Sequence, residues 1–192
     1  MAQIEAVLAS QNANKLAELR EGLPGWQLEA LESDEWPAET GSTYYENALI
    51  KARFAHGRAR GWTIGEDSGI EVAALGGRPG VHSARYAPEG APAIAKLLQE
   101  LRGVDDRRAR YVSELVAIGP DGEELRGTGI LDGTIAHGPR GTGGFGYDPV
   151  FVPQGEHRTV AELGDEWKNE HSHRARAVRA LREAFERRLD GA

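Results

Sequence analysis

The stretch Ile4–Lys15, IEAVLASQNANK, joins a short apolar run to a polar turn. Its first six residues have the length and composition of a buried strand. After the turn, Leu16, Leu19 and Leu23 recur at intervals of three and four residues, which is the spacing of one face of a helix. The stretch therefore predicts a strand, a polar turn and a helix, in that order.

Strands and helices alternate along the rest of the chain. We expect strands near 28–31, 62–64, 111–118 and 125–131, helices near 45–55, 94–101 and 178–189, and loops at 32–42, 65–69 and 76–90. The turn sequence Gly119-Pro120-Asp121-Gly122 predicts a hairpin between the last two strands. The predicted class is therefore α/β, or mixed α+β, with a central mixed sheet flanked by helices.

Composition limits the organisation and the function. A chain of 192 residues with 40% hydrophobic residues can bury one sizeable core, so we expect residues 1–192 to form a single domain, built of two closely joined lobes. The glycine-rich stretch 76–90 in the middle of the chain predicts a substrate cleft between the two lobes. The net charge of -7 disfavours binding to nucleic acid or anionic lipid. There are no cysteines, and no segment approaches the roughly 20 apolar residues of a membrane helix. We expect a cytoplasmic protein.

The run Ser10–Lys15 lies at the predicted start of a helix. Free backbone N–H groups and the positive end of the helix dipole favour an anion there, and Lys15 adds a full charge. The alternative is that Asn12 or Asn14 is an N-cap and that Lys15 is a solvated lysine of the first turn. The run by itself fits both interpretations.

Carboxylates gather around the run Glu66-Asp67-Ser68-Gly69. Together with Glu39 and Glu46 from the preceding loop and helix, they could hold a hard divalent cation through oxygen, and Mg²⁺ is the natural candidate. Mg²⁺ uses one or two protein carboxylates and completes its octahedron with water and substrate phosphates. The alternative is that Asp67-Ser68-Gly69 is only a turn.

The run Gly141–Pro149, GTGGFGYDP, is the strongest single signal in the chain. Glycine lacks a Cβ and so lets backbone approach a ligand closely, and Phe145 offers a face on which a base can stack. The alternative is a tight loop with core aromatics. Lys168 and the pair His173-Arg174 follow at the start of the last helix, where they could meet phosphates or base carbonyls, or simply carry surface charge.

In this order the segments resemble the inosine triphosphate pyrophosphatase family, the house-cleaning pyrophosphatases of non-standard purine nucleotides. The resemblance covers nearly the full chain and rests on Ser10–Lys15, Glu39-Thr40-Gly41 with Glu46-Asn47-Ala48, Asp67-Ser68-Gly69, Pro79-Gly80 with Ser83-Ala84-Arg85-Tyr86, Gly141–Pro149 and Ser172-His173-Arg174. It implies a homodimer that depends on Mg²⁺ and cleaves ITP, dITP and XTP between the α and β phosphates, releasing the monophosphate and pyrophosphate.

The resemblance also implies roles for individual residues. Asp67 would accept a proton from the attacking water and would bind Mg²⁺ with Glu39. Donors at His173 and Arg174 would read the C6 carbonyl that adenine lacks, whereas nothing in the sequence identifies what excludes guanine. The implied substrate-binding residues are Ser10, Gln11, Asn12, Ala13, Asn14, Lys15, Ser68, Phe145, Gly146, Tyr147, Asp148, Lys168, His173 and Arg174.

The chain departs from the family pattern in three places. Members often carry Thr-Gly where Ser10-Gln11 stands. Bacterial members often carry paired acids where Ala38-Glu39 stands, and Asp-Asp where Glu66-Asp67 stands. The second metal ligand is therefore open among three glutamates, and we place it on Glu39, with Glu46 and Glu66 as alternatives.

Two other functions fit parts of the sequence. One is a pyrophosphatase for modified pyrimidine or other non-standard nucleotides, against which the run Phe145–Asp148 argues. The other is a module that senses a triphosphate without cutting it, which the presence of Asp67 and Glu39 disfavours. In each case the expected partner is a small nucleotide, and neither nucleic acid nor a membrane.

Overall fold

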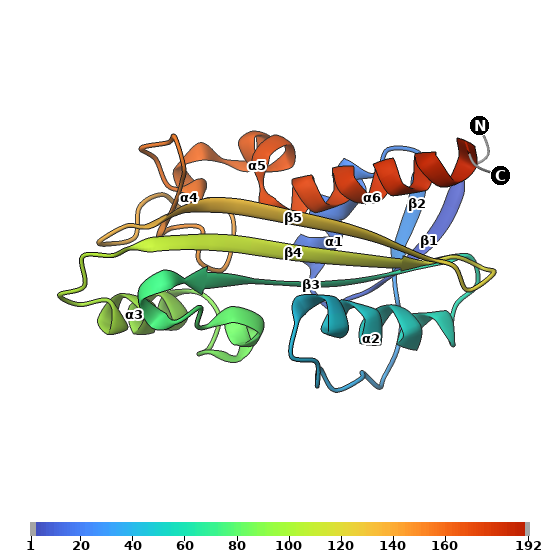
Figure 1. The fold of residues 1–192 in the computed structure, drawn as a ribbon, viewed down its shortest axis with the longest axis horizontal. Coiled ribbons are helices and arrows are strands. Elements are labelled where there is room, and N and C mark those ends of the chain that lie inside the picture. The colour runs from blue at the N-terminus through green and yellow to red at the C-terminus, as the bar shows by residue number, and fades with distance from the viewer. Residues whose placement is uncertain (1–2, 191–192) are drawn as a thin grey trace. The chain divides into compact units, whose positions relative to one another are not determined.

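The computed structural model describes residues 3–190, which is all but the ends of the predicted domain 1–192. Its six-stranded sheet has the order β2-β1-β3-β4-β5-β6 (Figure 1). The strands are β1 (Ile4–Ala9), β2 (Trp26–Ala30), β3 (Trp62–Val72), β4 (Arg108–Ile118), β5 (Glu124–Ile135) and β6 (Phe151–Pro153). Strand β1 is parallel to β2 and β3, whereas β5 and β6 are antiparallel. The predicted mixed sheet is confirmed.

The helices alternate with the strands in the first third of the chain, as expected. They are α1 (Ala13–Gly22), α2 (Tyr44–His56), α3 (Ala91–Glu100), α4 (Val160–Leu163), α5 (Asp165–His171) and α6 (His173–Asp190), with 3-10 turns at Ala73–Leu75 and Gly80–Arg85. The sequence did not predict β6, α4 or α5, because each is too short to show a period. Within residues 3–190, no helix has the length and apolar character needed to cross a membrane.

Two compact units make up the described chain. The first takes in residues 3–67, 113–129 and 174–190. Its core includes Leu8, Ile64 and Leu181. Helices α2 and α6 cover opposite faces of its strands (Figure 1). Each helix packs closely against a strand at a glycine. A Cβ on Gly65 would lie 1.9 Å from the Ala48 carbonyl oxygen on α2, and one on Gly127 would lie 2.2 Å from the Ala177 carbonyl oxygen on α6.

The second unit takes in residues 68–112 and 130–173. Its core is formed by Ile70, Leu97, Tyr111 and Phe151, among others. Helix α3 contributes Leu97 to this core, and the amphipathic spacing that predicted this helix is confirmed. The expectation of one domain with a substrate cleft stays a prediction.

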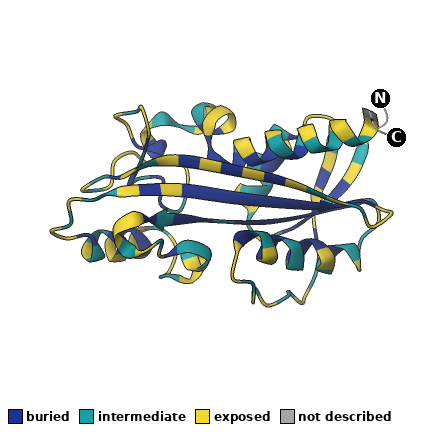
Figure 2. Cartoon of the chain, viewed as in Figure 1, coloured by how far each residue is buried: buried dark blue, intermediate teal, exposed yellow. Residues whose placement is uncertain are grey.

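One loop prediction is wrong. Strand β3 continues through Gly65–Gly69, which we expected to be a polar loop or turn, and Figure 2 shows the strand buried along nearly its whole length. Charged residues that follow an apolar run normally predict the end of a buried strand, because burying a charge without a partner is costly. Here Glu66 and Asp67 are buried because each meets a cation.

Candidate active site

Helix α1 begins at a capped turn. The Asn12 side chain is its N-cap and accepts hydrogen bonds from the backbone N–H groups of Asn14 and Lys15, at 2.9 and 3.2 Å. The N–H of Asn12 in turn donates to Oγ of Ser10. The N-cap interpretation of Asn12 is therefore confirmed, and binding of an anion by Ser10, Gln11, Asn12, Ala13 and Asn14 stays a prediction.

Lys15 is not the solvated lysine of the alternative interpretation. Its side chain is 17% exposed, and its Nζ lies 2.6 Å from Oε2 of the buried Glu66. Arg174 donates from Nε to Oε1 of the same carboxylate at 3.2 Å and from Nη1 to Glu18. Burial alone would raise the pKa of Glu66, but Lys15 and Arg174, helped by Lys51, outweigh it and hold that pKa well below its usual range. Glu66 is thus an ionised anchor for two cations.

Asp67 lies on the other face of β3, because side chains alternate along a strand. Nζ of Lys51 on helix α2 lies 3.1 Å from Oδ1 of Asp67 and 2.8 Å from Oε1 of Glu39. Burial opposes the charged form of Lys51, but Asp67, Glu66 and Glu39 outweigh it and raise the pKa of the lysine. A single buried ammonium therefore draws together the two carboxylates that the sequence assigned to the metal.

Lys51 was not predicted from the sequence. A signal for it was present, since Lys51 lies three residues after Ala48 and one before Ala52, on the buried side of α2. Among the alternatives for the second metal ligand, Glu46 is engaged elsewhere: its Oε2 accepts from the N–H groups of Ser42 and Thr43 in the capping box of α2. The ion pairs of Lys51 join Glu39 to Asp67, whereas Glu66 pairs with Lys15 and Arg174.

The environment of Asp67 makes its carboxylate more basic. Burial raises the pKa of Asp67, and the nearby charges of Glu66 and Glu39 act in the same direction, while Lys51 and Lys15 oppose them only in part. Ser68, the next residue on β3, is half-buried. A raised pKa in a carboxylate that faces cations is a feature of functional sites, because the group is then a better proton acceptor.

The chemistry of this group fits Mg²⁺. Within residues 3–190, no three carboxylate or imidazole side chains come together as a metal cage. Mg²⁺ does not need one, since one or two carboxylates suffice when water and phosphates complete its octahedron. Glu39 and Asp67 converge on one ammonium, that of Lys51, so two carboxylates face a single positive charge there. An additional cation would be stabilised at this position.

In the second unit, Asp148 organises the glycine-rich loop. Its Oδ2 accepts from the N–H of Phe145 at 2.9 Å and from Nζ of Lys168 at 2.8 Å, and its Oδ1 accepts from the hydroxyl of Tyr111. Gly144 has a φ of 69°, and a Cβ there would lie 2.2 Å from Oδ2 of Asp148. Glycine is therefore required at this position by both the backbone conformation and the space.

The aromatic residues of the loop differ in their surroundings. Tyr147 is buried in the core of the second unit and donates to the carbonyl of Ser83, as the alternative of core aromatics predicts. Phe145 is half-buried beside Gly146, and Nζ of Lys168 lies 4.4 Å from its ring centroid. The Phe145 ring is thus held in place by the loop and by a cation.

His173 is also held by an aromatic ring. Its imidazole stacks on Tyr111 with the ring centroids 4.5 Å apart and the planes 11° apart. Lys168, His173 and Arg174 are all buried, so the interpretation of these residues as surface charge is wrong. His173 belongs to the second unit, whereas Arg174 belongs to the first and directs two of its donors at carboxylates. Base recognition by either residue stays a prediction.

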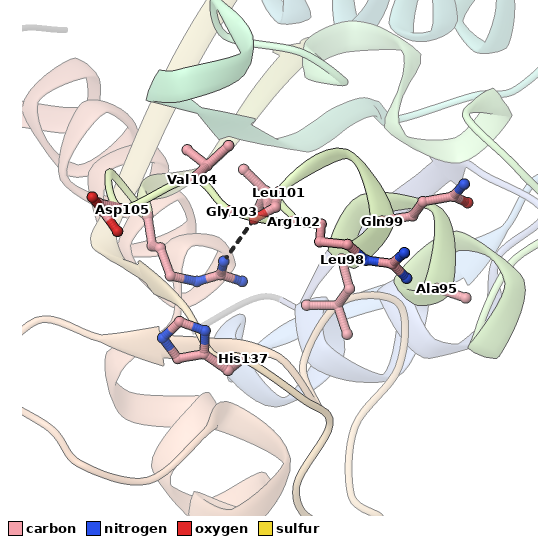
Figure 3. Close-up of a pocket in the computed structure, with 10 residues that line it drawn as sticks. Ala95, Leu98, Gln99, Leu101, Arg102, Gly103, Val104, Asp105 and His137 are labelled. Carbon is pink, nitrogen blue, oxygen red and sulfur yellow. Dashed lines mark hydrogen bonds between the residues drawn. The ribbon is translucent and has the colours of Figure 1, made fainter.

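The second unit has a cavity of about 560 Å³ whose lining includes none of the predicted site residues (Figure 3). Arg107 lines it and donates to the carbonyl oxygens of Ile135, Ala136 and Leu101. These bonds tie the end of α3 to the end of β5. The position of Arg107 is therefore explained by a structural role, and no ligand is needed to explain it. A second cavity, of about 480 Å³, lies against Gly141–Gly146 and is lined by Ile94, Leu98 and Phe145, among others.

Comparisons with known proteins add an independent observation. A sequence model of the Ham1 family matches residues 6–184. The dITP/XTP pyrophosphatase of Deinococcus deserti is 45% identical over 184 residues, which are 94% of this chain and 88% of that protein. The structure of the Staphylococcus aureus Ham1 protein has a TM-score of 0.81 at 38% identity, covering 97% of this chain and 98% of that one. A HAM1 protein from Coxiella burnetii has a TM-score of 0.80 at 39% identity, covering 98% and 100%.

Proposed function

Since the chain belongs to the Ham1 family, we propose that it hydrolyses non-standard purine nucleoside triphosphates, namely ITP, dITP and XTP, to the monophosphate and pyrophosphate with the help of Mg²⁺. The name of the Deinococcus deserti relative supports this substrate class. The observation in the structure that carries the proposal is the convergence of Glu39 and Asp67 on one buried cation.

Glu39 and Asp67 are the residues that would hold Mg²⁺. When bound, Mg²⁺ supplies charge neutralisation to the phosphate oxygens of the substrate. In this assignment the ammonium of Lys51 holds the two carboxylates close together, and it stays charged because they raise its pKa. Phosphate binding, proton acceptance and base recognition are assigned to residues of the protein.

The phosphate-binding side chain is Lys15. A nucleoside triphosphate brings roughly four negative charges, and most of the catalysis of its cleavage consists of positioning and electrostatic stabilisation. Lys15 is fixed by Glu66, which is itself fixed by Arg174, so its ammonium is preorganised and not freely mobile. It would neutralise charge that develops on the departing pyrophosphate, aided by the positive end of α1.

Asp67 would orient the water that attacks the α-phosphorus and accept its proton. Its raised pKa favours proton acceptance, and the ammonium of Lys51 beside Oδ1 keeps it from being protonated before the reaction. Ser68 would contact the substrate and is not needed as a nucleophile, so no covalent intermediate is formed in this scheme.

We assign base recognition to the second unit. Phe145 offers a ring for stacking, and its position is set by the bond from its own N–H to Asp148. His173 and the backbone N–H groups of Gly146 and Tyr147 would donate to the C6 carbonyl of hypoxanthine or xanthine, whereas the N–H of Asp148 donates to the carbonyl of Phe145. Adenine carries an amine there and would set donor against donor, which can cost as much as about 10⁴-fold in kcat/KM. Lys168 would support the base site indirectly, by holding Asp148. Arg174 would support the phosphate site in the same indirect way, by holding Glu66.

Two further parts of the proposal rest on the family alone: a homodimer, and activity in the cytoplasm. Light scattering of the purified protein tests the first.

A substrate panel tests the function. Purified protein with Mg²⁺ is given ITP, dITP, XTP, GTP and ATP in turn, and kcat/KM is measured from release of pyrophosphate. The proposal expects the first three to exceed ATP by at least about 100-fold, because a site of hydrogen-bond donors rejects the C6 amine of adenine. GTP shares the C6 carbonyl, so its value measures how far the 2-amino group is discriminated. Equal values for ITP and ATP would contradict the purine assignment, and binding without turnover would favour a sensing module.

A further inference from the structure

We infer that Asn47 is a positioning residue for the catalytic group, because its amide ties Asp67 to the loop that carries Glu39. The inference rests on the proposed function and deepens it. Asn47 lies in the first turn of helix α2 and is completely buried, although it is polar. Buried amides are retained where both of their ends find partners.

Both ends of the Asn47 amide are used. Its Nδ2 donates to Oδ2 of Asp67 at 3.2 Å, and its Oδ1 accepts from the N–H of Gly41 at 2.8 Å. The orientation of the amide is therefore fixed by chemistry, since the reversed amide would set Oδ1 against a carboxylate and Nδ2 against an N–H donor. A single side chain joins the strand residue to the loop residue.

The loop fits closely against this amide. A Cβ on Gly41 would lie 2.7 Å from Oδ1 of Asn47 and 2.6 Å from Cβ of Glu46. Only glycine allows the backbone to approach the helix so closely. Glu39 precedes Gly41 by two residues, so the Asn47 bond limits where its carboxylate can lie.

The contacts divide the oxygens of Asp67 between two partners. Oδ2 is held by Asn47, and Oδ1 faces Lys51, which also holds Glu39. The orientation of the Asp67 carboxylate is thus set before any ligand binds. Residues that orient a metal ligand in this way affect metal affinity or activity by about 10- to 100-fold when they are changed.

Two variants separate the two bonds. Asn47→Leu has a similar volume and removes both. Asn47→Asp keeps the oxygen that accepts from Gly41 but replaces the donor to Asp67 with a second acidic oxygen. The matched control is Thr63→Val, because Thr63 is completely buried in the same unit and its hydroxyl lies within hydrogen-bond distance of the carbonyls of Ala52 and Ile118. All three are compared with the parent chain at a temperature where each is folded.

The measurements are kcat and KM for dITP, the Mg²⁺ concentration at half-maximal rate, and hydrogen exchange of the Gly41 amide without nucleotide or metal. In both Asn47 variants we expect kcat to fall by about 10- to 100-fold while KM changes less, because positioning of the reacting group is lost. The Gly41 amide should exchange faster in Asn47→Leu and stay protected in Asn47→Asp. Thr63→Val should lower the melting temperature only.

The inference is overturned if kcat in a folded Asn47 variant stays within about twofold of the parent chain, or falls no further than in Thr63→Val. If Asn47→Leu does not fold, Asn47→Asp decides the question alone. Failure of the proposed function has a different signature: the parent chain itself would then release no pyrophosphate from dITP, while the pattern of Gly41 exchange would be unchanged.

Discussion

Nζ of Lys51 lies 3.1 Å from Oδ1 of Asp67, and both side chains are about nine-tenths buried. The same nitrogen also lies 2.8 Å from Glu39, so one cation balances two carboxylates. Removing one partner of a buried ion pair leaves the other charge uncompensated, which typically costs about 3 kcal/mol or more.

We therefore expect Lys51→Met to lower the free energy of unfolding by about 3 kcal/mol in the absence of metal. Millimolar Mg²⁺ should raise the melting temperature of the variant more than that of the parent chain, because a divalent cation then replaces the missing charge. Lys96→Met is the control, since Lys96 is exposed and donates to the carbonyl of Tyr86. A Mg²⁺ effect no larger in Lys51→Met than in the parent chain would argue against a metal at Glu39 and Asp67.

Glu66 makes stability depend on pH. Its pKa in the folded chain is held below the usual 4.5, so it contributes stability that is fully present above pH 4.5 and is lost as the pH falls further. Glu66→Gln should be destabilised by about 3 kcal/mol at neutral pH, with a deficit that shrinks below pH 4.5. The measurement is chemical denaturation of both proteins across this range.

The control for this prediction is Glu29→Gln. Glu29 pairs with Arg20, but both side chains are largely exposed, so the pair contributes little. A deficit in Glu66→Gln that stays constant down to pH 3 or so would show that the carboxylate is not kept ionised by its neighbours.

The close fit of Gly144 against Asp148 predicts a loss of activity in Gly144→Ala. The new methyl would collide with Oδ2 of Asp148 and break its bonds to Phe145 and Lys168. We expect kcat/KM for ITP to fall by at least about 10-fold, as is usual when residues that support a binding site are displaced.

Gly155→Ala separates the collision from backbone strain. Gly155 also has a positive φ, of 87°, but a Cβ there would have no atom within 4 Å. A left-handed conformation alone costs about 1–2 kcal/mol of stability, so both variants should lose that much. Comparable kcat/KM values in the two variants would show that the loop does not depend on Asp148.

The assignment of His173 to the base predicts a change in selectivity. His173→Ala should reduce the ratio of kcat/KM for ITP over ATP by about 10-fold or more, because a donor to the C6 carbonyl is lost. His171→Ala is the matched control, as His171 lies two residues away with a half-exposed side chain. An unchanged ratio in His173→Ala would show that the base is read by other groups.

The sequence predicted the part of the fold in which apolar period and turn residues agree. Strand β1, helix α1 and the β4–β5 hairpin were found because their apolar residues recur at the spacing of the element and polar or glycine-rich turns separate them. Strand β3 was predicted only to residue 64, because Glu66 and Asp67 resemble a polar loop when their buried partners are not known. Those partners, Lys15, Lys51 and Arg174, come from three different helices.

The candidate site was predictable to a similar degree. The sequence grouped Glu66 with Asp67, whereas alternation along β3 sends them to opposite faces, where one anchors Lys15 and the other faces Lys51. Lys51 and Asn47 were not singled out because a polar residue on a helix is normally solvated, and only the structure shows that both are buried and contact Asp67. Phe145 and Asp148 were singled out because the glycine-rich run around them is specific, and their contact with a nucleotide stays a prediction.

The central claim is that this chain cuts a non-standard purine triphosphate between the α and β phosphates, with Asp67 as the proton acceptor. The most direct measurement is ³¹P NMR of dITP with Mg²⁺ and the parent chain, with Asp67→Asn run in parallel. The account predicts dIMP and pyrophosphate in equal amounts, and no turnover in Asp67→Asn although the variant still binds nucleotide. Release of orthophosphate with dIDP, or near-normal turnover in Asp67→Asn, would contradict it.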